Sequence, residues 1–385
     1  MNQCVDFIAV GGGIAGVAVG AELARHGSVL LIERETSLSY HTTGRSAAIS
    51  MESYGNATIR QLTCASRQFF ENPPSELSAD VLSTPRGALI VSDDVHYGKL
   101  RARYEAVVHA VPNAQWLDRK AVGDMAPFLS EHWVAGIHEP SAFDLDVHAI
   151  HSAFVRGIRV RGGTVRTSAE IAQAQNTGSA WTVKLTDGDT VQAGSIINAA
   201  GAWADVVAKR CGLPWPGLQT LLRTVVVVDP ERDLTHCPYI GTVDEQIFMK
   251  PDVGRLMVSP CDETPSEPCD ALPDELGVAI AMDRLLGATT LRPKRVLNRW
   301  AGLRVFAPDR SPIVGADPMQ ESFIWYAALG GYGIQTAPAL ARLCAALAMR
   351  DPLPADLSGI NTTAISPQRM LGNTSAELVK VANLN

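Results

Sequence analysis

The sequence has few of the features that mark a metal-binding or disulfide-linked protein. Its 385 residues include seven cysteines, an odd number, and no two of them form a CxxC pair. This absence argues against a thiolate zinc site, an iron–sulfur cluster and a thioredoxin-type dithiol, so we expect no metal. Scattered, unpaired cysteines are typical of reduced thiols in a cytosolic protein, and we therefore expect a cytoplasmic location.

Long apolar runs and clusters of basic residues are also missing. No apolar run approaches the roughly 20 residues that a membrane-spanning helix needs, and the apolar segment near the N-terminus lacks the basic region of a signal peptide. The formal net charge is −7, which argues against nucleic acid as a partner. With 46% hydrophobic and 19% charged residues, the composition is that of an ordinary globular protein. The length favours two domains.

The most informative segment opens the chain. An apolar run at residues 5–10, suited to a buried parallel strand, leads into a GxGxxG turn formed by Gly11, Gly13 and Gly16. The first glycine permits the tight turn, the second lets the backbone approach a pyrophosphate, and the third lets helix and strand pack closely. A helix-prone segment and a second apolar run ending at Glu33 complete one βαβ unit. This order predicts a dinucleotide site.

Glu33 narrows the choice of dinucleotide. A carboxylate at the end of the second strand accepts hydrogen bonds from a ribose hydroxyl, whereas it repels a 2′-phosphate. NADP is therefore disfavoured. NAD and FAD both remain open at this point.

Hydrophobic periodicity predicts alternating helices and strands along the rest of the chain. Helices are expected at residues 58–72, 97–110, 148–161, 279–288 and 339–350. Strands are expected at 87–91, 164–167, 221–228 and 247–258, with a hairpin at 181–193 and a further strand starting at 195. The glycine-rich segment 330–338 is expected to be a loop. The fold class is α/β.

Four motifs together suggest a known family. They are the glycine turn with Glu33, the segment AAGAW at 199–203, RSPIVG at 310–315 and GGYGI at 330–334. In this order the chain resembles the FAD-dependent D-amino-acid oxidase superfamily, which includes glycine oxidase and sarcosine oxidase. Within it, the segments 40–48, 300–304 and 330–336 are most similar to bacterial D-arginine dehydrogenase. The resemblance implies non-covalently bound FAD rather than NAD.

The resemblance also implies a discontinuous layout. A Rossmann-type FAD-binding domain would consist of residues 1–75, 146–215 and 304–385. A substrate-binding domain with a mixed sheet and helices would consist of residues 76–145 and 216–303. The family likeness covers nearly the whole chain.

The family's cofactor contacts transfer to positions in three parts of this sequence. The ADP half of FAD would lie against the opening turn, and the pyrophosphate and flavin ring against segment 42–48. The pyrimidine end of the ring would lie against the last glycine-rich segment. The implied residues are Gly11, Gly13, Ile14, Ala15, Gly16, Glu33, Arg34, Thr42, Thr43, Gly44, Arg45, Ser46, Ala47, Ala48, Ile171, Ala200, Gly201, Trp203, Arg304, Gly330, Gly331, Tyr332, Gly333 and Ile334.

Three residues match the family's substrate contacts. Arg223 and Arg304 match arginines that bind the substrate carboxylate, and Tyr54 matches a tyrosine facing the substrate. Each has an ordinary structural alternative: Arg223 as a solvated residue at a strand end, and Tyr54 as a loop anchor. Arg304 lies between apolar residues and requires a partner, which a bidentate carboxylate would supply.

The chain departs from D-arginine dehydrogenase where the substrate side chain is bound. Its acid is absent from segment 85–89, where Ala88 stands, its histidine is replaced by Ile49, and a second tyrosine is replaced by Phe248. The pocket, which would also include Gly331, should therefore not favour arginine or lysine. Glu52 lies close in sequence to segment 42–48, which would line the flavin ring, so its carboxylate is a candidate for the replacement charge.

The implied reaction is oxidation of the C–N bond of a D-amino acid or N-substituted amino acid. Hydride would pass to flavin N5, and the imine formed would be hydrolysed to an oxo acid. The electron acceptor would be a quinone or O₂. One alternative is a 2-hydroxy acid oxidase or dehydrogenase, for which His41 or His138 would be the base. Another is a flavin-binding, non-catalytic subunit of a heteromeric oxidase.

Overall fold

The opening βαβ unit forms the centre of a large sheet. A computed structural model describes residues 3–111, 113–213 and 217–370. β1 (Gln3–Val10) pairs in parallel with β2 (Val29–Ile32) on one side and with β12 (Thr190–Asn198) on the other, and α1 (Ile14–Leu23) crosses between β1 and β2. β2 and the C-terminal half of β1 are almost completely buried, which explains their continuous apolar sequence. The expected α/β fold class is confirmed.

Eight strands make up this first sheet. Their order is β10–β11–β12–β1–β2–β9, and β20 pairs with the C-terminal half of β12 and with β19. The additional bounds are β9 Thr164–Arg166, β10 Ile171–Asn176, β11 Trp181–Leu185, β19 Ile313–Ala316 and β20 Phe323–Ala327. The hairpin strand and the strand expected to start at 195 are one continuous strand, β12. Gly194 allows this because a Cβ there would lie only 2.9 Å from the backbone oxygen of Asp6 on β1.

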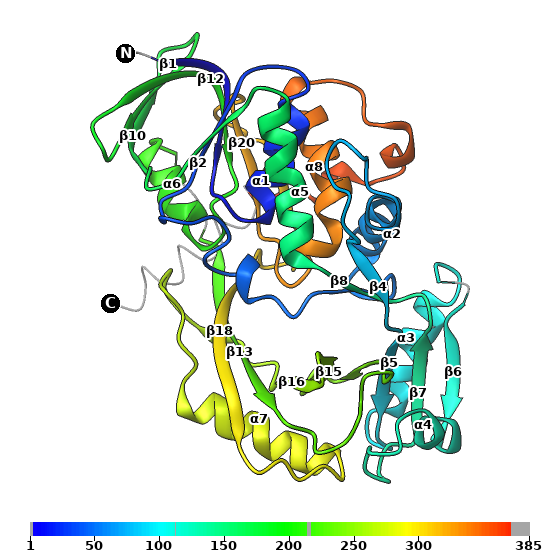
Figure 1. Cartoon of the computed structure of the whole chain (residues 1–385). Helices are drawn as coiled ribbons and strands as arrows, with labels where there is room; N and C mark the ends of the chain where they lie inside the picture. Colours follow the sequence, from blue (N-terminus) through cyan, green and yellow to red (C-terminus); the bar gives the residue numbers. More distant parts are fainter. Residues whose placement is uncertain (1–2, 112, 214–216, 371–385) are drawn as a thin grey trace, which may run out of the picture.

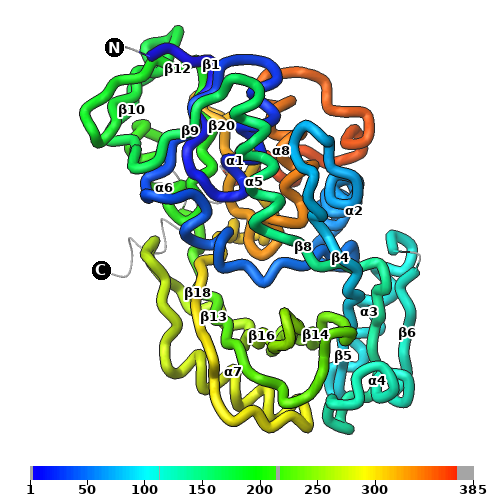
Figure 2. Tube along the Cα trace, viewed as in Figure 1, coloured from blue at the N-terminus to red at the C-terminus, as the bar shows by residue number. Residues whose placement is uncertain are grey.

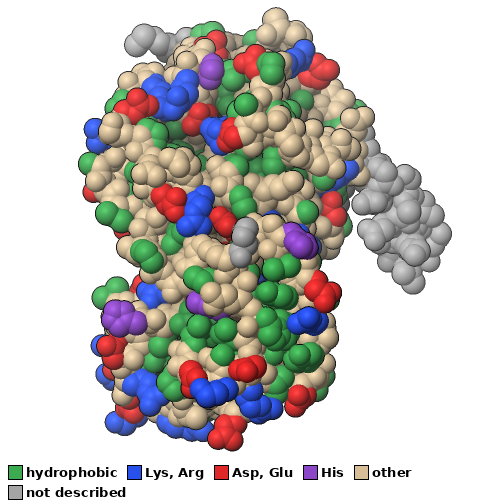
Figure 3. All heavy atoms as spheres, turned by 90° about the vertical axis from the view of Figure 1, so that its right-hand side faces the viewer, with side chains coloured by type: hydrophobic (Ala, Val, Ile, Leu, Met, Phe, Trp, Pro, Cys, Tyr) green, Lys and Arg blue, Asp and Glu red, His purple; other side chains and the backbone are tan. Residues whose placement is uncertain are grey.

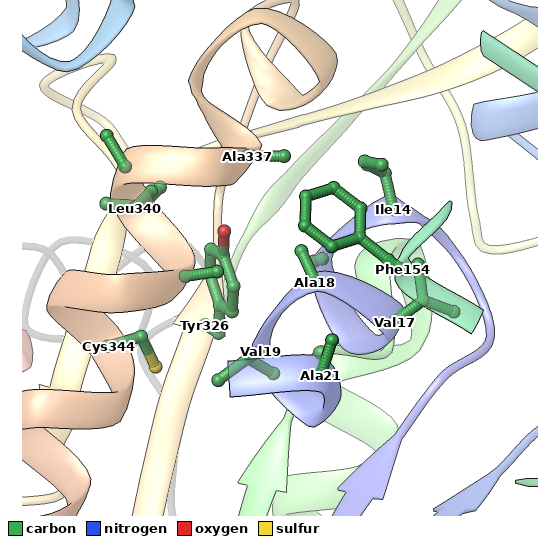
Figure 4. Close-up of a cluster of buried hydrophobic side chains, with 14 of the residues drawn as sticks. Ile14, Val17, Ala18, Val19, Ala21, Phe154, Tyr326, Ala337, Leu340 and Cys344 are labelled. Atoms are coloured by element: carbon green, nitrogen blue, oxygen red, sulfur yellow. The ribbon is translucent and has the colours of Figure 1, made fainter. Parts of the chain in front are cut away.

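Helices cover both faces of the first sheet (Figure 1). On one face α1 packs against α5 (Val147–Val160) and α8 (Gly333–Met349), and α2 (Ala57–Glu71) packs against α8. Phe154 of α5 and Leu340 of α8 converge with α1 residues above Tyr326 (Figure 4). On the opposite face α6 (Ala204–Arg210) packs on β10 and β12.

Helix α8 begins six residues earlier than expected. The sequence pattern predicts a loop up to residue 338, but the helix starts at Gly333 and contains Pro338. A proline within a helix loses one backbone hydrogen bond. Residues 334–341 are all buried against neighbouring helices, and this packing outweighs the lost bond.

A second, nine-stranded sheet forms the other half of the molecule. Its order is β17–β13–β16–β15–β14–β5–β7–β6, with β18 on the second edge of β13. Helices α3, α4 and α7 flank it (Figure 1). The bounds are β5 Ala88–Ser92, α3 Tyr97–Val107, β6 Gln115–Asp118, α4 Arg119–Met125, β7 Ala135–Glu139, β13 Gln219–Val228, β14 Tyr239–Thr242, β15 Phe248–Asp252, β16 Arg255–Ser259, β17 Thr264–Pro265, α7 Glu275–Ala288 and β18 Val296–Phe306.

The single strand expected at 247–258 is a hairpin. β15 and β16 are joined by a tight turn at Val253 and Gly254, whose φ angles are +43° and +71°. Gly254 adopts this conformation without strain. The alternating apolar residues on both sides made the two strands look continuous.

Segments far apart in sequence meet in each half (Figure 2). All strands of the first sheet lie within residues 1–75, 146–215 and 304–385, and those of the second within 76–145 and 216–303, apart from the last residues of β18. A small third sheet, β3 (Ile49–Ser50), β8 (Phe143–Leu145) and β4 (Ser83–Pro85), takes strands from both sets. The exact domain boundaries stay a prediction.

The surface has mixed charge. Basic and acidic side chains are interspersed over the face shown in Figure 3. Among the described residues, no helix combines the length and apolar character needed to cross a bilayer.

His151 on α5 forms a hydrogen bond with the opening glycine turn. Its Nε2 atom lies 2.9 Å from the Gly12 carbonyl oxygen, and the side chain is buried. Burial lowers the pKa of His151. Because a carbonyl only accepts hydrogen bonds, the neutral ring carries its proton on Nε2 and donates it to Gly12.

Acidification should destabilise the protein through His151. The unfolded chain takes up a proton near the ordinary His pKa of 6.5, before the folded protein does, so stability falls as the pH drops from that value towards the lower folded pKa. His151→Gln retains a donor but does not titrate. Between pH 7 and pH 5, the unfolding free energy of His151→Gln, measured by urea titration, should therefore fall less than that of the wild type. An identical pH dependence in the two proteins would contradict this.

Phe154→Ala tests the core between α1, α5 and α8. Phe154 is 1% exposed and stacks on Phe69 at a ring-centroid distance of 4.9 Å. Its truncation leaves a cavity, so we expect a loss of about 3–5 kcal/mol in unfolding free energy. Val160→Ala on the exposed end of the same helix should change stability by less than about 0.5 kcal/mol. Similar losses in the two variants would show that this core contributes little.

Candidate functional site

A cavity extends along the junction of the two sheets. The turn after β1, segment 39–51, the ends of β12 and β20, and the start of α8 line it from the first half. Strands β13, β14 and β18 and helix α3 line it from the second half. The cavity therefore brings together the N-terminal, middle and C-terminal parts of the chain.

The glycine turn forms one end of this cavity. Gly11 has a φ of +109°, and a Cβ there would lie 2.6 Å from the Ala199 oxygen. A Cβ on Gly16 would lie 1.9 Å from the Gly11 oxygen. Only glycine allows β1, α1 and the end of β12 to approach this closely. Gly16 itself does not line the cavity and acts through Gly11.

The N-terminus of α1 faces the cavity, and few nearby groups compensate its partial positive charge. Gly13 is the N-cap, and within the described chain neither a capping side chain nor an acidic residue occupies the first turn. The Ile14 N–H donates to Thr43 Oγ1 at 3.0 Å, which ties the turn to segment 42–48. A helix N-terminus of this kind favours an anion such as a phosphate.

Glu33 closes the same end of the cavity. Its two carboxylate oxygens accept hydrogen bonds from the backbone N–H groups of Gly12, at 2.6 Å, and Glu35, at 2.8 Å. A carboxylate has further lone pairs, so it retains capacity for a ribose hydroxyl. The backbone contacts hold it facing the cavity.

Trp203 is packed between two side chains close to Glu33. The Arg34 guanidinium lies 4.9 Å from its ring centroid and the His41 ring lies 4.5 Å from it. His41 also places Nε2 3.0 Å from the Glu35 carboxylate. This position assigns His41 to the end of the cavity near Glu33.

Arg45 lines the cavity but directs its guanidinium into the protein. It donates to the carbonyl oxygens of Ala271, at 2.8 Å, and Ala301, at 3.0 Å, and it pairs with Asp270. The Arg45 carbonyl oxygen accepts a bond from Trp300 Nε1 at 2.9 Å. Arg45 thus fastens segment 42–48 to β18. Family resemblance alone did not reveal this structural use of the side chain.

Arg223 and Arg304 project from adjacent strands onto one face of the second sheet. In the antiparallel pairing of β13 with β18, Arg223 lies opposite Gly302 and Arg304 lies opposite Leu221. Side chains two residues apart on a strand share a face, so the two arginines are diagonal neighbours. Gly302 leaves space beside Arg223. Both guanidinium groups line the cavity.

Arg304 is a cation without a partner. Its guanidinium makes no hydrogen bond or ion pair with any described residue, although it lies deep in the cavity. A Cβ on Gly331 would lie 2.9 Å from its Cζ, so the glycine loop before α8 approaches it directly. Burial opposes the charge, but nearby groups, beginning with Tyr54 and Cys261, raise the pKa of Arg304 on balance.

Arg223 is partly neutralised. Its Nη2 lies 3.3 Å from Glu263, and Glu263 also accepts two hydrogen bonds from Arg310 at 2.9 and 2.7 Å. The buried Nε of Arg223 has no hydrogen-bond partner among the described residues. Burial, followed by the positive charge of Arg304, lowers the pKa of Arg223. Of the three guanidinium nitrogens of Arg223, only Nη2 has a hydrogen-bond partner among the described residues, whereas none of those of Arg304 has one.

Tyr54 and several residues not expected from sequence complete the wall near Arg304. Tyr54 lies 5.1 Å from the Tyr332 ring, and Tyr239 stacks on Phe248 at 5.6 Å. Cys261, Glu245 and Arg103 also line the cavity. Local sequence patterns carry no signal for these three, because each lies on a different turn or helix that only the fold brings to the cavity.

Several predicted residues do not line the cavity. Ile171, the first residue of β10, is fully buried in a core cluster, and Ala88 packs against Met51 and Ala142. Glu52 forms an ion pair with Arg67 at 3.1 Å. These three residues are not part of the cavity lining, and their expected ligand contacts stay predictions. Gly44 and Tyr332 lie directly beside lining residues, and half-buried His138 also lies outside the cavity lining.

All other predicted site residues line the cavity. They are Gly11, Gly13, Ile14, Ala15, Glu33, Arg34, Thr42, Thr43, Arg45, Ser46, Ala47, Ala48, Ile49, Tyr54, Ala200, Gly201, Trp203, Arg223, Phe248, Arg304, Gly330, Gly331, Gly333 and Ile334. Their ligand contacts stay a prediction.

Comparison with curated proteins places the chain among flavoenzymes. It is 21% identical to mitochondrial dimethylglycine dehydrogenase of Mus musculus, over 91% of this chain and 43% of that protein. It is 23% identical to glycine oxidase of Bacillus licheniformis, over 92% of this chain and 95% of that protein. The chain spans about half the length of the first curated relatives that it matches.

A solved structure shares the fold. L-α-glycerophosphate oxidase from Mycoplasma pneumoniae, determined with FAD bound, superposes with a TM-score of 0.82 at 17% identity, over 90% of this chain and 95% of that one. The model of the FAD dependent oxidoreductase family DAO matches residues 6–347. This match covers most of the chain, so the protein belongs to the DAO family of FAD dependent oxidoreductases and its cofactor is FAD.

Proposed function

We propose that this protein oxidises the C–N bond of an amino acid that carries a free carboxylate. The observation that carries the proposal is the partnerless guanidinium of Arg304, held in the same cavity as the glycine turn. A half-buried cation without an anion is costly, and a bound carboxylate would compensate it with bidentate hydrogen bonds. The relatives named glycine oxidase and dimethylglycine dehydrogenase support an amine substrate.

The residues around the glycine turn fit FAD. Gly11 and Gly13 leave the cradle open where a side chain would stand, and the N-terminus of α1 suits the pyrophosphate. Glu33 would bind the ribose of the ADP half. The segments 42–48 and 330–334 would hold the flavin ring between the glycine turn and Arg304.

Arg304 would bind the substrate carboxylate, and the guanidinium of Arg223, which lines the same cavity, would supply a further donor. Fixing the carboxylate orients the Cα–H bond, and such alignment lowers the barrier by several kcal/mol. Bound FAD supplies a hydride acceptor, so the amine is oxidised to an imine. Water then hydrolyses the imine to an oxo acid and releases the amine.

Oxidation of an amine does not require a strong catalytic base from the protein. A neutral amine loses hydride without a strong base, whereas a 2-hydroxy acid requires a group that accepts the hydroxyl proton. Among the described residues that line the cavity, the one histidine is His41, and it pairs with Glu35 near Glu33. This arrangement favours the amine over the hydroxy acid.

Gly11→Ala should weaken FAD binding. The added Cβ meets the Ala199 oxygen at 2.6 Å, and the backbone conformation is strained for alanine by about 1–3 kcal/mol. The ratio of flavin to protein absorbance after purification should fall. Gly98→Ala on α3, whose Cβ would meet nothing within 4 Å, should retain the wild-type ratio. Full flavin content in Gly11→Ala would contradict the assignment of this turn to FAD.

Arg304→Met should abolish most substrate oxidation while FAD remains bound. Loss of a bidentate charge-assisted contact should lower the second-order rate of anaerobic flavin reduction by about 100-fold. The test is an anaerobic screen of D-, L- and N-methyl amino acids, in which loss of visible flavin absorbance measures flavin reduction. Arg299→Met, on the same strand but exposed and paired with Glu275, should match the wild type.

Adding 2-hydroxy acids to this screen distinguishes the other functions. Reduction by 2-hydroxy acids and by no amine would assign the protein to alcohol oxidation. A flavin that none of these compounds reduces would assign it to a non-catalytic subunit. Equal rates for Arg304→Met and wild type would remove Arg304 from substrate binding. Repeating the successful reactions in air would identify O₂ as acceptor if the flavin is reoxidised.

A further inference from the structure

Arg103 is a second cation in the cavity without a partner. It lies on α3, which packs beside β5 and β7, and its side chain is half-buried. It lines the same cavity as Arg304, and it forms no hydrogen bond or ion pair with any described residue. The function proposed above, with one substrate carboxylate on Arg304, leaves Arg103 without a role.

A half-buried arginine without a hydrogen-bond or ion-pair partner is unusual among the described residues of this protein. Arg101, one half-turn earlier on α3, is exposed, pairs with Glu105 at 3.3 Å and lies 5.1 Å from the Trp116 ring. The remaining arginines that lack a partner among the described residues all have exposed side chains: Arg156, Arg159, Arg232 and Arg295. Arg103 and Arg304 alone in the described chain combine a sheltered position with the lack of any hydrogen-bond or ion-pair partner, and both line one cavity.

Two aromatic rings line the cavity on the side of the second sheet. Tyr239 begins β14 and stacks on Phe248 of β15. The charge of Arg103 acts on the Tyr239 hydroxyl, as does that of Arg304. Tyr239 is therefore close to both arginines.

Of the acidic residues that line the cavity, Glu245 is the one that belongs to the second sheet's half of the molecule. It lies on the exposed turn between β14 and β15 and is not within 4.0 Å of any basic side chain in the described chain. Its charge raises the pKa of Cys261, of Tyr332 and of Arg310. Glu33 and Glu170 line the opposite end of the cavity, with Arg34 close to Glu170. Arg103 thus lacks an acidic partner and has access to the substrate space.

We propose that the substrate carries a second acidic group, and that Arg103 binds it while Arg304 binds the carboxylate next to the amine. The substrate class is an acidic amino acid or an N-substituted amino acid with two carboxylates. The guanidinium of Arg103 matches a carboxylate in a fork geometry that an uncharged amide does not reproduce. This inference rests on the proposed function, since it names the substrate of the same site.

The test compares acidic substrates with their neutral isosteres. Anaerobic flavin reduction is measured with both enantiomers of aspartate, glutamate and 2-aminoadipate, and with asparagine and glutamine. We expect the acids to react with a kcat/KM about 10- to 100-fold higher than the amides. Arg103→Met should remove this preference by raising KM for the acids, with little change for the amides. Arg101→Met should retain it.

Binding without turnover separates the two proposals. Glutarate and butyrate are titrated into the FAD-loaded protein, and the shift in the flavin visible spectrum gives their dissociation constants. Tighter binding of glutarate, lost in Arg103→Met, supports the second acidic subsite even if no amino acid reduces the flavin, in which case only the proposed reaction fails. Equal binding of glutarate and butyrate, or a preference for lysine and arginine that Glu245→Gln removes, would overturn the role of Arg103.

Discussion

The close approach of three backbone segments at Gly11 is the constraint on which the site depends. β1, the start of α1 and the end of β12 meet there without an intervening side chain. The contact continues outward, because Thr43 bonds the first helical amide of α1 and neighbouring Thr42 bonds the carbonyl oxygen of Leu303 at 2.7 Å. Leu303 precedes Arg304 on β18. The glycine turn and the strand that carries Arg304 are thus joined by one chain of hydrogen bonds between the two sheets.

Charge distribution gives the cavity its chemical character. Glu263 is shared by Arg310 and Arg223, which reduces the demand of Arg223 for another anion. Arg304 and Arg103 receive no such compensation from the described chain. Burial without a counter-charge is unfavourable, so the folded protein favours ligands that bring anionic groups. This charge distribution supports the proposal that the substrate is held first by its carboxylates.

Sequence periodicity predicted the helices well where one face is buried and the other exposed. α2 and α5 are of this kind, and their expected bounds differ from the observed ones by one residue at either end. The pattern failed for α8, because Pro338 suggested a boundary that surrounding packing overrides. It failed again for β15 and β16, since alternation continues through a two-residue turn. Among the predicted site residues, Ile171 and Ala88 lie outside the cavity lining, because a motif does not reveal which side chains of a strand are packed in the core.

The sequence by itself determined the βαβ unit with its glycine turn, and hence the cofactor class through the family motifs. These features depend on residues close together in the chain, whose φ angles and backbone contacts only glycine allows. The tertiary structure alone decided which arginines are free. Arg45 finds Asp270 across 225 residues and Arg310 finds Glu263 across 47, whereas Arg103 and Arg304 find no described partner. Ion pairing depends on separations in space that the folded arrangement of distant segments creates. The site's selectivity was therefore set by the fold.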